Sequence, residues 1–127
     1  KSLEIEKSFI AYFFRAYALG ELKKHEKAIL DYKNAIQYND ESAPAFNNLG
    51  VSFAEIGDNY KAINYYEKAI SLDPELAAAY SNTGNSKIIL GMRRSGCNDY
   101  KKAAYLGSKT ALEWIRSSNG YWCRNLR

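Results

Sequence analysis

Apolar and small residues recur at helical spacing along most of this chain of 127 residues. Within 43–74, two stretches place such residues about three, four and seven positions apart, which is the pattern of one helical face. The first face consists of Phe46, Leu49, Gly50 and Phe53, and the second consists of Ala62, Tyr66, Ala69 and Ile70. Gly57 separates the two faces, because glycine adopts positive φ without steric cost. The segment therefore predicts two helices folded back on each other.

The same pattern returns every 34 residues along the chain. The matching columns are Tyr12, Phe46 and Tyr80; Ala16, Gly50 and Gly84; Ala28, Ala62 and Gly96; Tyr32, Tyr66 and Tyr100; and Ala35, Ala69 and Ala103. A fixed period of this length is typical of a helical solenoid, in which each hairpin buries its apolar face against the next. The sequence therefore predicts an all-α protein built as an α-solenoid.

The columns resemble the tetratricopeptide repeat (TPR) family, whose pattern is an aromatic, Leu-Gly, an aromatic, then Ala, an aromatic, Ala and Pro. The residues that match it are Phe46, Leu49-Gly50, Phe53, Ala62, Tyr66, Ala69 and Pro74. The resemblance covers about residues 9–110 and implies a right-handed superhelix of antiparallel helix pairs. We expect a lead-in over 1–8, repeats over 9–42, 43–76 and 77–110, and a capping helix with a tail over 111–127. The ending YWCRNLR resembles that of some bacterial members of the family.

The first repeat departs from the pattern at its turn. Lys23 stands in the column of Gly57, and Gly20 comes three residues early, so this turn is expected to differ in shape. His25 lies beside it and is the only histidine, and we expect it to be a solvated turn residue.

Composition sets the class of protein. Hydrophobic residues make up 46% of the chain, and the mean hydropathy of -0.47 is ordinary for a soluble protein. No apolar run approaches the roughly 20 residues of a membrane-spanning helix. We therefore expect a cytoplasmic protein, with an N-terminal targeting segment left open because residue 1 is Lys. Cys97 and Cys123 are too few for a disulfide scaffold, and two independent reduced thiols are favoured over a pair.

The sequence lacks the common catalytic, metal-binding and phosphate-binding motifs. It has no Gly-rich phosphate loop, no HExxH, no Cys-x-x-Cys and no nucleophile in a recognised setting. A single histidine leaves almost no choice of general base at neutral pH. The sequence therefore predicts a protein that is not an enzyme, without catalytic residues, metal or cofactor.

The resemblance implies a binding role, because the first helix of each TPR pair lines a concave groove that holds a peptide. The expected groove residues are Phe13, Tyr17, Asn47, Asn48, Val51, Ser81, Asn82, Asn85 and Arg116. An asparagine amide both donates and accepts, so it can pair with the backbone of any peptide. Hydrogen bonding between adjacent helices is an equally open role for these asparagines. The family's chaperone-binding members clamp a terminal carboxylate with basic residues, and Phe13, Tyr17 and Ala78 argue against that clamp here.

Charge leaves two alternatives open. The chain carries a net charge of +4, whereas residues 93–127 alone carry +6, with five tyrosines and tryptophans interleaved. Clustered cations and aromatic faces suit nucleic acid, but the tyrosines largely fall in core columns, so an acidic protein partner is favoured. The third alternative is a structural role, as a spacer or through self-association of the first helix. We expect a monomer.

Overall fold

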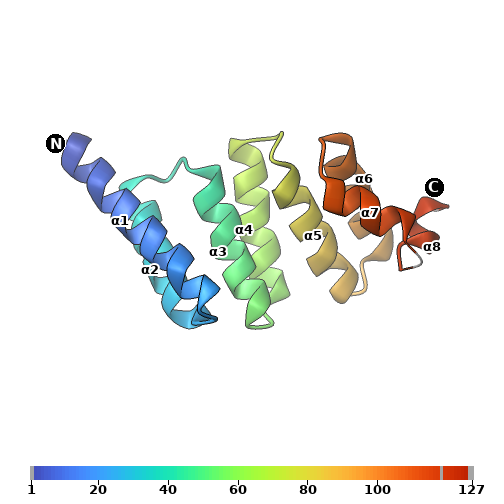
Figure 1. Ribbon diagram of the computed structural model, residues 1–127, viewed down its shortest axis with the longest axis horizontal. Helices are drawn as coiled ribbons and strands as arrows, with labels where there is room; N and C mark the ends of the chain where they lie inside the picture. The colour runs from blue at the N-terminus through green and yellow to red at the C-terminus, as the bar shows by residue number, and fades with distance from the viewer. Residues whose placement is uncertain (1, 118, 126–127) are drawn as a thin grey trace.

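The computed structural model describes residues 2–117 and 119–125. These residues form helices and no strand. The helices are α1 (Ser2–Glu21), α2 (His25–Tyr38), α3 (Ala43–Glu55), α4 (Asn59–Leu72), α5 (Ala77–Ile89), α6 (Arg93–Tyr105), α7 (Lys109–Arg116) and α8 (Tyr121–Arg124). Pairs α1–α2, α3–α4 and α5–α6 form hairpins that stack in a row (Figure 1). The prediction of an all-α solenoid is confirmed.

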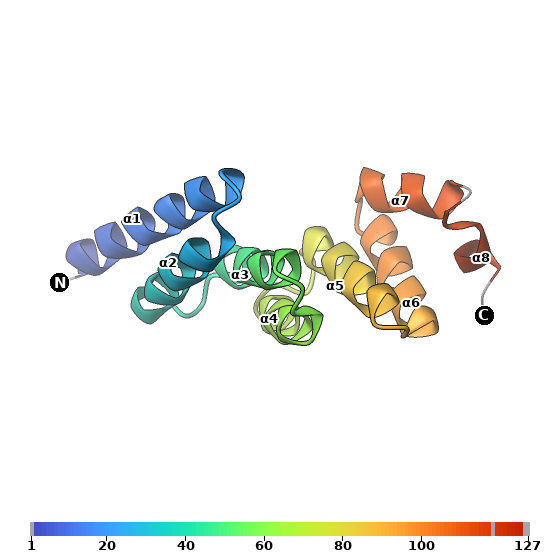
Figure 2. The ribbon, with the colours of Figure 1, turned by 90° about the horizontal axis from the view of Figure 1, so that it is seen from below.

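The row of hairpins is curved. Figure 2 shows α1, α3, α5 and α7 along one side, and α2, α4 and α6 along the other. Since α1 and α7 rise at the two ends, the side formed by the first helices is concave. The segment expected to be a lead-in belongs to α1, which begins at Ser2. No helix among the described residues is long and apolar enough to cross a membrane.

Local sequence signals fix several helix ends. The side chains of Ser42, Asp58 and Ser108 accept hydrogen bonds from the backbone N–H groups of Ala45, Lys61 and Ala111, at 3.2, 3.1 and 3.1 Å. Each bond satisfies a donor that has no partner inside the helix. At its other end, α4 stops at Leu72, before Asp73-Pro74, because proline disfavours a helical conformation in the preceding residue.

The turns inside the three hairpins have one shape. Lys23, Gly57 and Gly91 occupy the same column and all have positive φ, at 65°, 91° and 89°. In each turn, the N–H of this residue donates to the carbonyl three residues earlier, and the next N–H donates to the carbonyl five residues earlier. The expectation of a different first turn is therefore wrong. These hydrogen bonds hold a lysine in a conformation that usually favours glycine, and Gly20 lies within α1.

Helices α5 and α6 cross closely at two glycines. A Cβ on Gly84 would lie 2.8 Å from the carbonyl oxygen of Gly96, and a Cβ on Gly96 would lie 2.9 Å from that of Gly84. We expect Gly84→Ala to lower the free energy of unfolding by about 1–2 kcal/mol, because the added methyl group pushes two backbones apart. Urea denaturation measures this change.

Gly20→Ala is the matched control for this substitution. Gly20 also lies within a helix, but a Cβ there would meet no atom within 4 Å. The alanine should raise the free energy of unfolding by about 0.5–1 kcal/mol through its helix propensity. Changes of the same sign in both variants would contradict the close crossing.

The cap at the C-terminal end covers the last hairpin. Trp114 of α7 stacks on Tyr100 of α6 with ring centroids 4.4 Å apart, and Trp122 of α8 meets Trp114 edge-on at 6.1 Å. Helix α7 therefore lies where the sequence predicts a capping helix, and the aromatic tail folds onto it.

Cys97 of α6 and Cys123 of α8 form a disulfide, with their Cα atoms 5.6 Å apart. The expectation of two independent reduced thiols is therefore wrong. The sequence does not fix the distance between these residues, which are 26 positions apart. The distance is set by the C-terminal tail, which folds back toward α6. At Gly120 the chain passes so close to the carbonyl of Trp114 that a Cβ would not fit.

Candidate functional site

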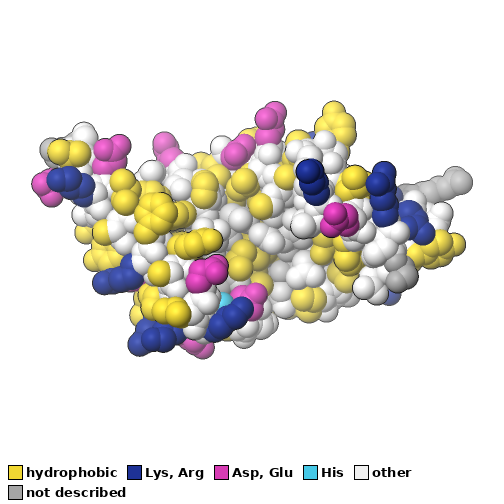
Figure 3. All heavy atoms as spheres, in the orientation of Figure 1, with side chains coloured by type: hydrophobic (Ala, Val, Ile, Leu, Met, Phe, Trp, Pro, Cys, Tyr) yellow, Lys and Arg dark blue, Asp and Glu magenta, His cyan; other side chains and the backbone are white. Residues whose placement is uncertain are grey.

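The concave face carries two separate hollows. The first measures about 180 Å³ and lies between α1 and α3, where it is lined by Tyr17, Asn48 and Val51 of the predicted groove residues. The second measures about 280 Å³ and lies between α5 and α7, where it is lined by Ser81, Asn82 and Asn85. Six of the nine predicted residues therefore border one of the two hollows. Figure 3 shows this face, with apolar side chains gathered over α1.

Tyr32 of α2 adds a hydroxyl group to the first hollow. Only 3% of this residue is exposed, and burial raises its pKa to about 12, although a hydrogen bond with Asn48 acts in the opposite direction. The phenol therefore stays neutral at physiological pH and keeps its proton for hydrogen bonding. The repeat pattern places Tyr32 in a core column and gives no sign that the same ring reaches the groove.

Acidic groups border the first hollow as well. Glu21 at the end of α1 and Glu55 at the end of α3 both line it, together with Lys23 and His25. The His25 Nε2 atom lies 3.9 Å from Glu55 Oε1, and its side chain is only 16% exposed. The expectation of a solvated histidine is therefore wrong. Its Nδ1 atom is buried and has no hydrogen-bond partner among the described residues.

Uncharged groups make up the second hollow. Its walls contain Tyr100 of α6 and Trp114 of α7 in addition to the three predicted residues of α5. The Tyr100 hydroxyl donates to Asn85 Oδ1 at 3.5 Å, which links α6 to the groove face of α5. The two hollows therefore differ in character: the first has two carboxylates and one lysine at its border, whereas the second is made of amide, hydroxyl and aromatic groups.

An amide bridge joins the helices between the hollows. Asn82 Nδ2 of α5 donates to Asn47 Oδ1 of α3 at 3.1 Å. Asn47 is only 7% exposed, so its main role in the structure is to hold this bond. This pair of asparagines therefore connects neighbouring helices, as one of the two alternatives expected. Asn82 also borders the second hollow.

Phe13 and Arg116 line neither hollow. Phe13 is half-buried and packs edge-on against Tyr32, with ring centroids 5.9 Å apart, so it supports the first hollow from the core. Arg116 is exposed at the end of α7, beyond the second hollow. Within the described part of the chain, no three His, Cys, Asp or Glu side chains gather in a way that would hold a metal ion.

Two family models match the chain. The model described as "Tetratricopeptide repeat" matches residues 43–76, and the model described as "TPR repeat" matches residues 16–57. The chain contains tetratricopeptide repeats. A comparison with the curated proteins gave no match.

Three solved structures, two of them TPR domains, superpose on most of the chain. The Arabidopsis OM64 TPR domain has a TM-score of 0.86 and 22% identity, over 94% of this chain and 97% of that one. The second TPR domain of human RPAP3, in complex with the HSP70 peptide SGPTIEEVD, has a TM-score of 0.83 and 20% identity, over 95% and 98%. MamA has a TM-score of 0.75 and 31% identity, over 82% of this chain and 61% of MamA. The first two likenesses establish a common fold.

Proposed function

We propose that this TPR protein is an interaction module that binds a peptide or protein segment along its concave face, without catalysing a reaction. The observation that carries the proposal is the pair of hollows, which lie on one face and on either side of the amide bridge. A segment laid along the solenoid would fill both hollows and cross the bridge. The relative RPAP3 supports the proposal, because its second TPR domain holds a peptide.

The predicted residues divide into contacts and supports. Tyr17, Asn48 and Val51 would contact the segment in the first hollow, and Ser81, Asn82 and Asn85 would contact it in the second. Asn47 would position Asn82, Phe13 would hold Tyr32, and Arg116 would meet an acidic group beyond the second hollow.

The charged residues that border the concave face indicate which amino acids the bound segment contains. Two carboxylates, of Glu21 and Glu55, and one ammonium group, of Lys23, border the first hollow, so a lysine or arginine of the partner fits there better than a carboxylate. A partner acidic throughout suits only the end near Arg116. The acidic peptide SGPTIEEVD, which RPAP3 binds, therefore makes a poor ligand for this groove.

The test uses peptides selected from a random library on the wild-type protein. The double substitution Asn48→Ala and Asn82→Ala should weaken their binding about tenfold, because it removes amide groups from both hollows. Isothermal titration calorimetry measures the affinity. Thermal unfolding followed by circular dichroism checks that the variant is folded.

Asn34→Ala with Asn98→Ala is the matched control, since both asparagines are exposed on second helices, away from the concave face. It should leave the affinity unchanged, and SGPTIEEVD should not compete with the selected peptides. Equal affinity for the wild type and the Asn48/Asn82 variant would contradict the proposed contacts and direct attention to Phe13 and Tyr17.

Nucleic acid is a weaker candidate for the C-terminal region. Three of its five aromatic rings are engaged within the chain, since Tyr100 stacks on Trp114 and Arg93 lies 4.0 Å from the ring centre of Trp122. Only Tyr105 and Tyr121 are largely exposed. Self-association is favoured by the exposed apolar side chains of α1, among them Ile10 at 49% and Phe14 at 60% exposure. A monomer stays our prediction, which sedimentation at several concentrations tests.

The disulfide bears on where the protein works. Disulfides persist in oxidising compartments and are rare in reducing cytosol. The Cys97–Cys123 bond therefore counts against the predicted cytoplasmic location, which stays untested.

A further inference from the structure

A single column of the repeat distinguishes the middle hairpin from its neighbours. Asp31, Tyr65 and Asp99 are 34 residues apart and occupy equivalent positions on α2, α4 and α6. Asp31 pairs with Arg15 of α1 at 2.6 Å, and Asp99 pairs with Lys87 of α5 at 2.9 Å. In both outer hairpins a carboxylate of the second helix therefore meets a cation of the first helix. The middle hairpin has a tyrosine in the place of that carboxylate.

Aromatic rings and lysines fill the corresponding place in the middle hairpin. Tyr65 stacks on Phe53 and Phe46 of α3, with ring centroids 5.4 and 6.3 Å apart. The ammonium groups of Lys33, Lys61 and Lys68 lie over these rings. Lys33 and Lys61 are 5.5 and 5.6 Å from the centre of the Phe53 ring, and Lys68 is 5.8 Å from that of Phe46. Together these rings and lysines form the lysine–aromatic groove.

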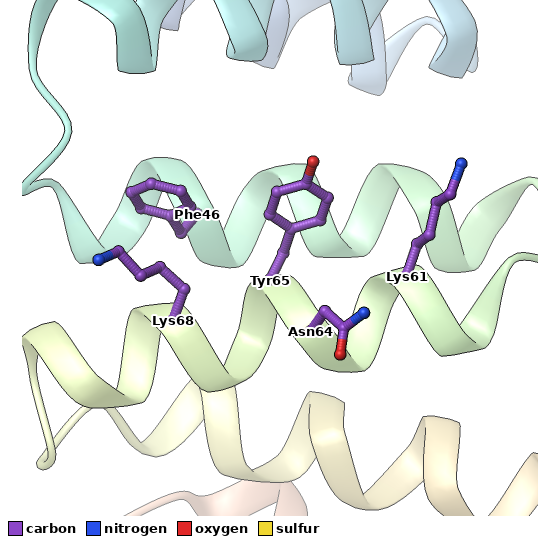
Figure 4. Close-up of a pocket in the computed structure, with 5 residues that line it drawn as sticks. All are labelled: Phe46, Lys61, Asn64, Tyr65 and Lys68. Atoms are coloured by element: carbon purple, nitrogen blue, oxygen red, sulfur yellow. The ribbon is translucent and has the colours of Figure 1, made fainter.

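A hollow of about 420 Å³ opens above this groove. Its lining contains Lys61, Tyr65 and Lys68, which lie on one face of α4, with Phe46 of α3 beside them (Figure 4). Because α4 lies on the side opposite the concave face, this hollow is separate from the two described above (Figure 2).

Among the described residues, only one cation of the groove has a carboxylate partner, and that contact is long. Lys61 meets Asp58 of its own helix only at 4.0 Å, with both side chains exposed, which is a weak interaction in water. Lys33 and Lys68 form no ion pair among the described residues, and the hollow's lining contains no carboxylate. The rings hold the ammonium groups in place by cation–π attraction. The groove therefore presents positioned positive charge beside an apolar floor.

We propose that the lysine–aromatic groove binds an acidic segment of a partner protein. The carboxylates of that segment take the role that Asp31 and Asp99 have in the outer hairpins, and an apolar side chain rests on Tyr65, which is only partly buried. Complementary charge of this kind selects the partner and speeds its association. This surface is independent of the concave groove, so the protein holds two different segments at once.

Nucleic acid fits the groove less well. Its recognition in single strands relies on bases that stack on open aromatic faces. Here Phe53 and Phe46 are only 6% and 7% exposed, and Tyr65 and the lysines cover their faces. Three lysines also provide few phosphate contacts, since stable binding in physiological salt requires several more.

The experiment measures fluorescence polarisation of a labelled acidic peptide pool, randomised from glutamate, leucine and phenylalanine, on the full chain. We expect saturable binding that weakens as salt rises. The variant Lys61→Gln with Lys68→Gln should bind about tenfold more weakly, because two ion pairs are lost. A uridine oligonucleotide serves as the nucleic-acid probe and should not bind.

Lys27→Gln with Lys102→Gln is the matched control. These lysines occupy the columns of Lys61 and Lys68 in the outer hairpins, so the variant loses the same net charge. It should bind within about twofold of wild type, as should Asn48→Ala with Asn82→Ala. Three outcomes would overturn the proposal. The two lysine variants could lose the same affinity for the acidic peptides, neither could lose any, or the oligonucleotide could bind more tightly than the peptides. Loss only in the asparagine variant would assign the acidic peptide to the concave face instead.

Discussion

Tyr66→Ala should lower the free energy of unfolding by about 4 kcal/mol, the cost typical of removing a buried aromatic ring. Tyr66 is 2% exposed and packs with Leu49 and Phe53 in the first core cluster. Its ring also fills the space that Gly50 leaves open, where a Cβ would come within 2.7 Å of Tyr66 Cδ1. Urea denaturation followed by far-UV circular dichroism measures the change.

The Tyr66 hydroxyl contributes separately. It forms a hydrogen bond with Ser86, which in turn donates to Asn59 Oδ1 at 2.8 Å, so α4 and α5 are linked through buried polar groups. Burial raises the pKa of Tyr66 above its ordinary value of 10, which keeps the hydroxyl neutral. Tyr66→Phe should therefore cost only about 1 kcal/mol, the usual value of one hydrogen bond.

Tyr60→Ala is the control on the same helix, because Tyr60 is 68% exposed. It should change stability by no more than about 0.5 kcal/mol. If Tyr60→Ala and Tyr66→Ala gave equal losses, the packing of hairpin on hairpin described here would be wrong.

The repeat pattern was sufficient to predict the fold. The column of Tyr32, Tyr66 and Tyr100 is buried in all three hairpins, at 3%, 2% and 9% exposure. Small residues such as Gly84 and Gly96 stand where the helices of a hairpin cross closely. These properties follow from the period alone, since equivalent positions of a solenoid have equivalent neighbours. A bacterial origin is not tested by the structure and stays a prediction.

The site was harder to predict, because its walls come from several elements. The resemblance to the repeat family placed the predicted residues on one face. In the structure Tyr17, Asn48 and Val51 border the first hollow, and Ser81, Asn82 and Asn85 border the second, while their contact with a partner stays a prediction. The repeat pattern did not predict that Glu21 and Glu55 border the first hollow, although both stand 34 residues apart at helix ends. Both residues reach this position because each stands at the end of its helix, beside the turn of its hairpin.

Residues that depart from the repeat pattern form a contact that the pattern does not predict. Lys87 stands in the column of Phe53, and its ammonium pairs with Asp99 at 2.9 Å and donates to Ser95 Oγ at 2.8 Å. An ion pair between two non-consensus residues of the same hairpin requires both helices to be in place. Sequence reasoning that judged each position alone could not find it.

The largest local effect is expected from the disulfide. Reducing Cys97–Cys123, or replacing both residues by serine, should destabilise the C-terminal cap by roughly 3 kcal/mol, because the bond closes a loop of 26 residues in the unfolded chain. Both tryptophans lie in this cap, so their fluorescence reports on it, whereas far-UV circular dichroism reports on the whole solenoid. With a phosphine reductant, the fluorescence transition should move to lower urea than the circular dichroism transition, since end repeats of a solenoid unfold separately when their contacts weaken. The reductant should not affect the double serine variant further. Coincident, unshifted transitions in reduced wild type would mean that Trp114, Trp122 and Arg93 hold the cap without the covalent bond.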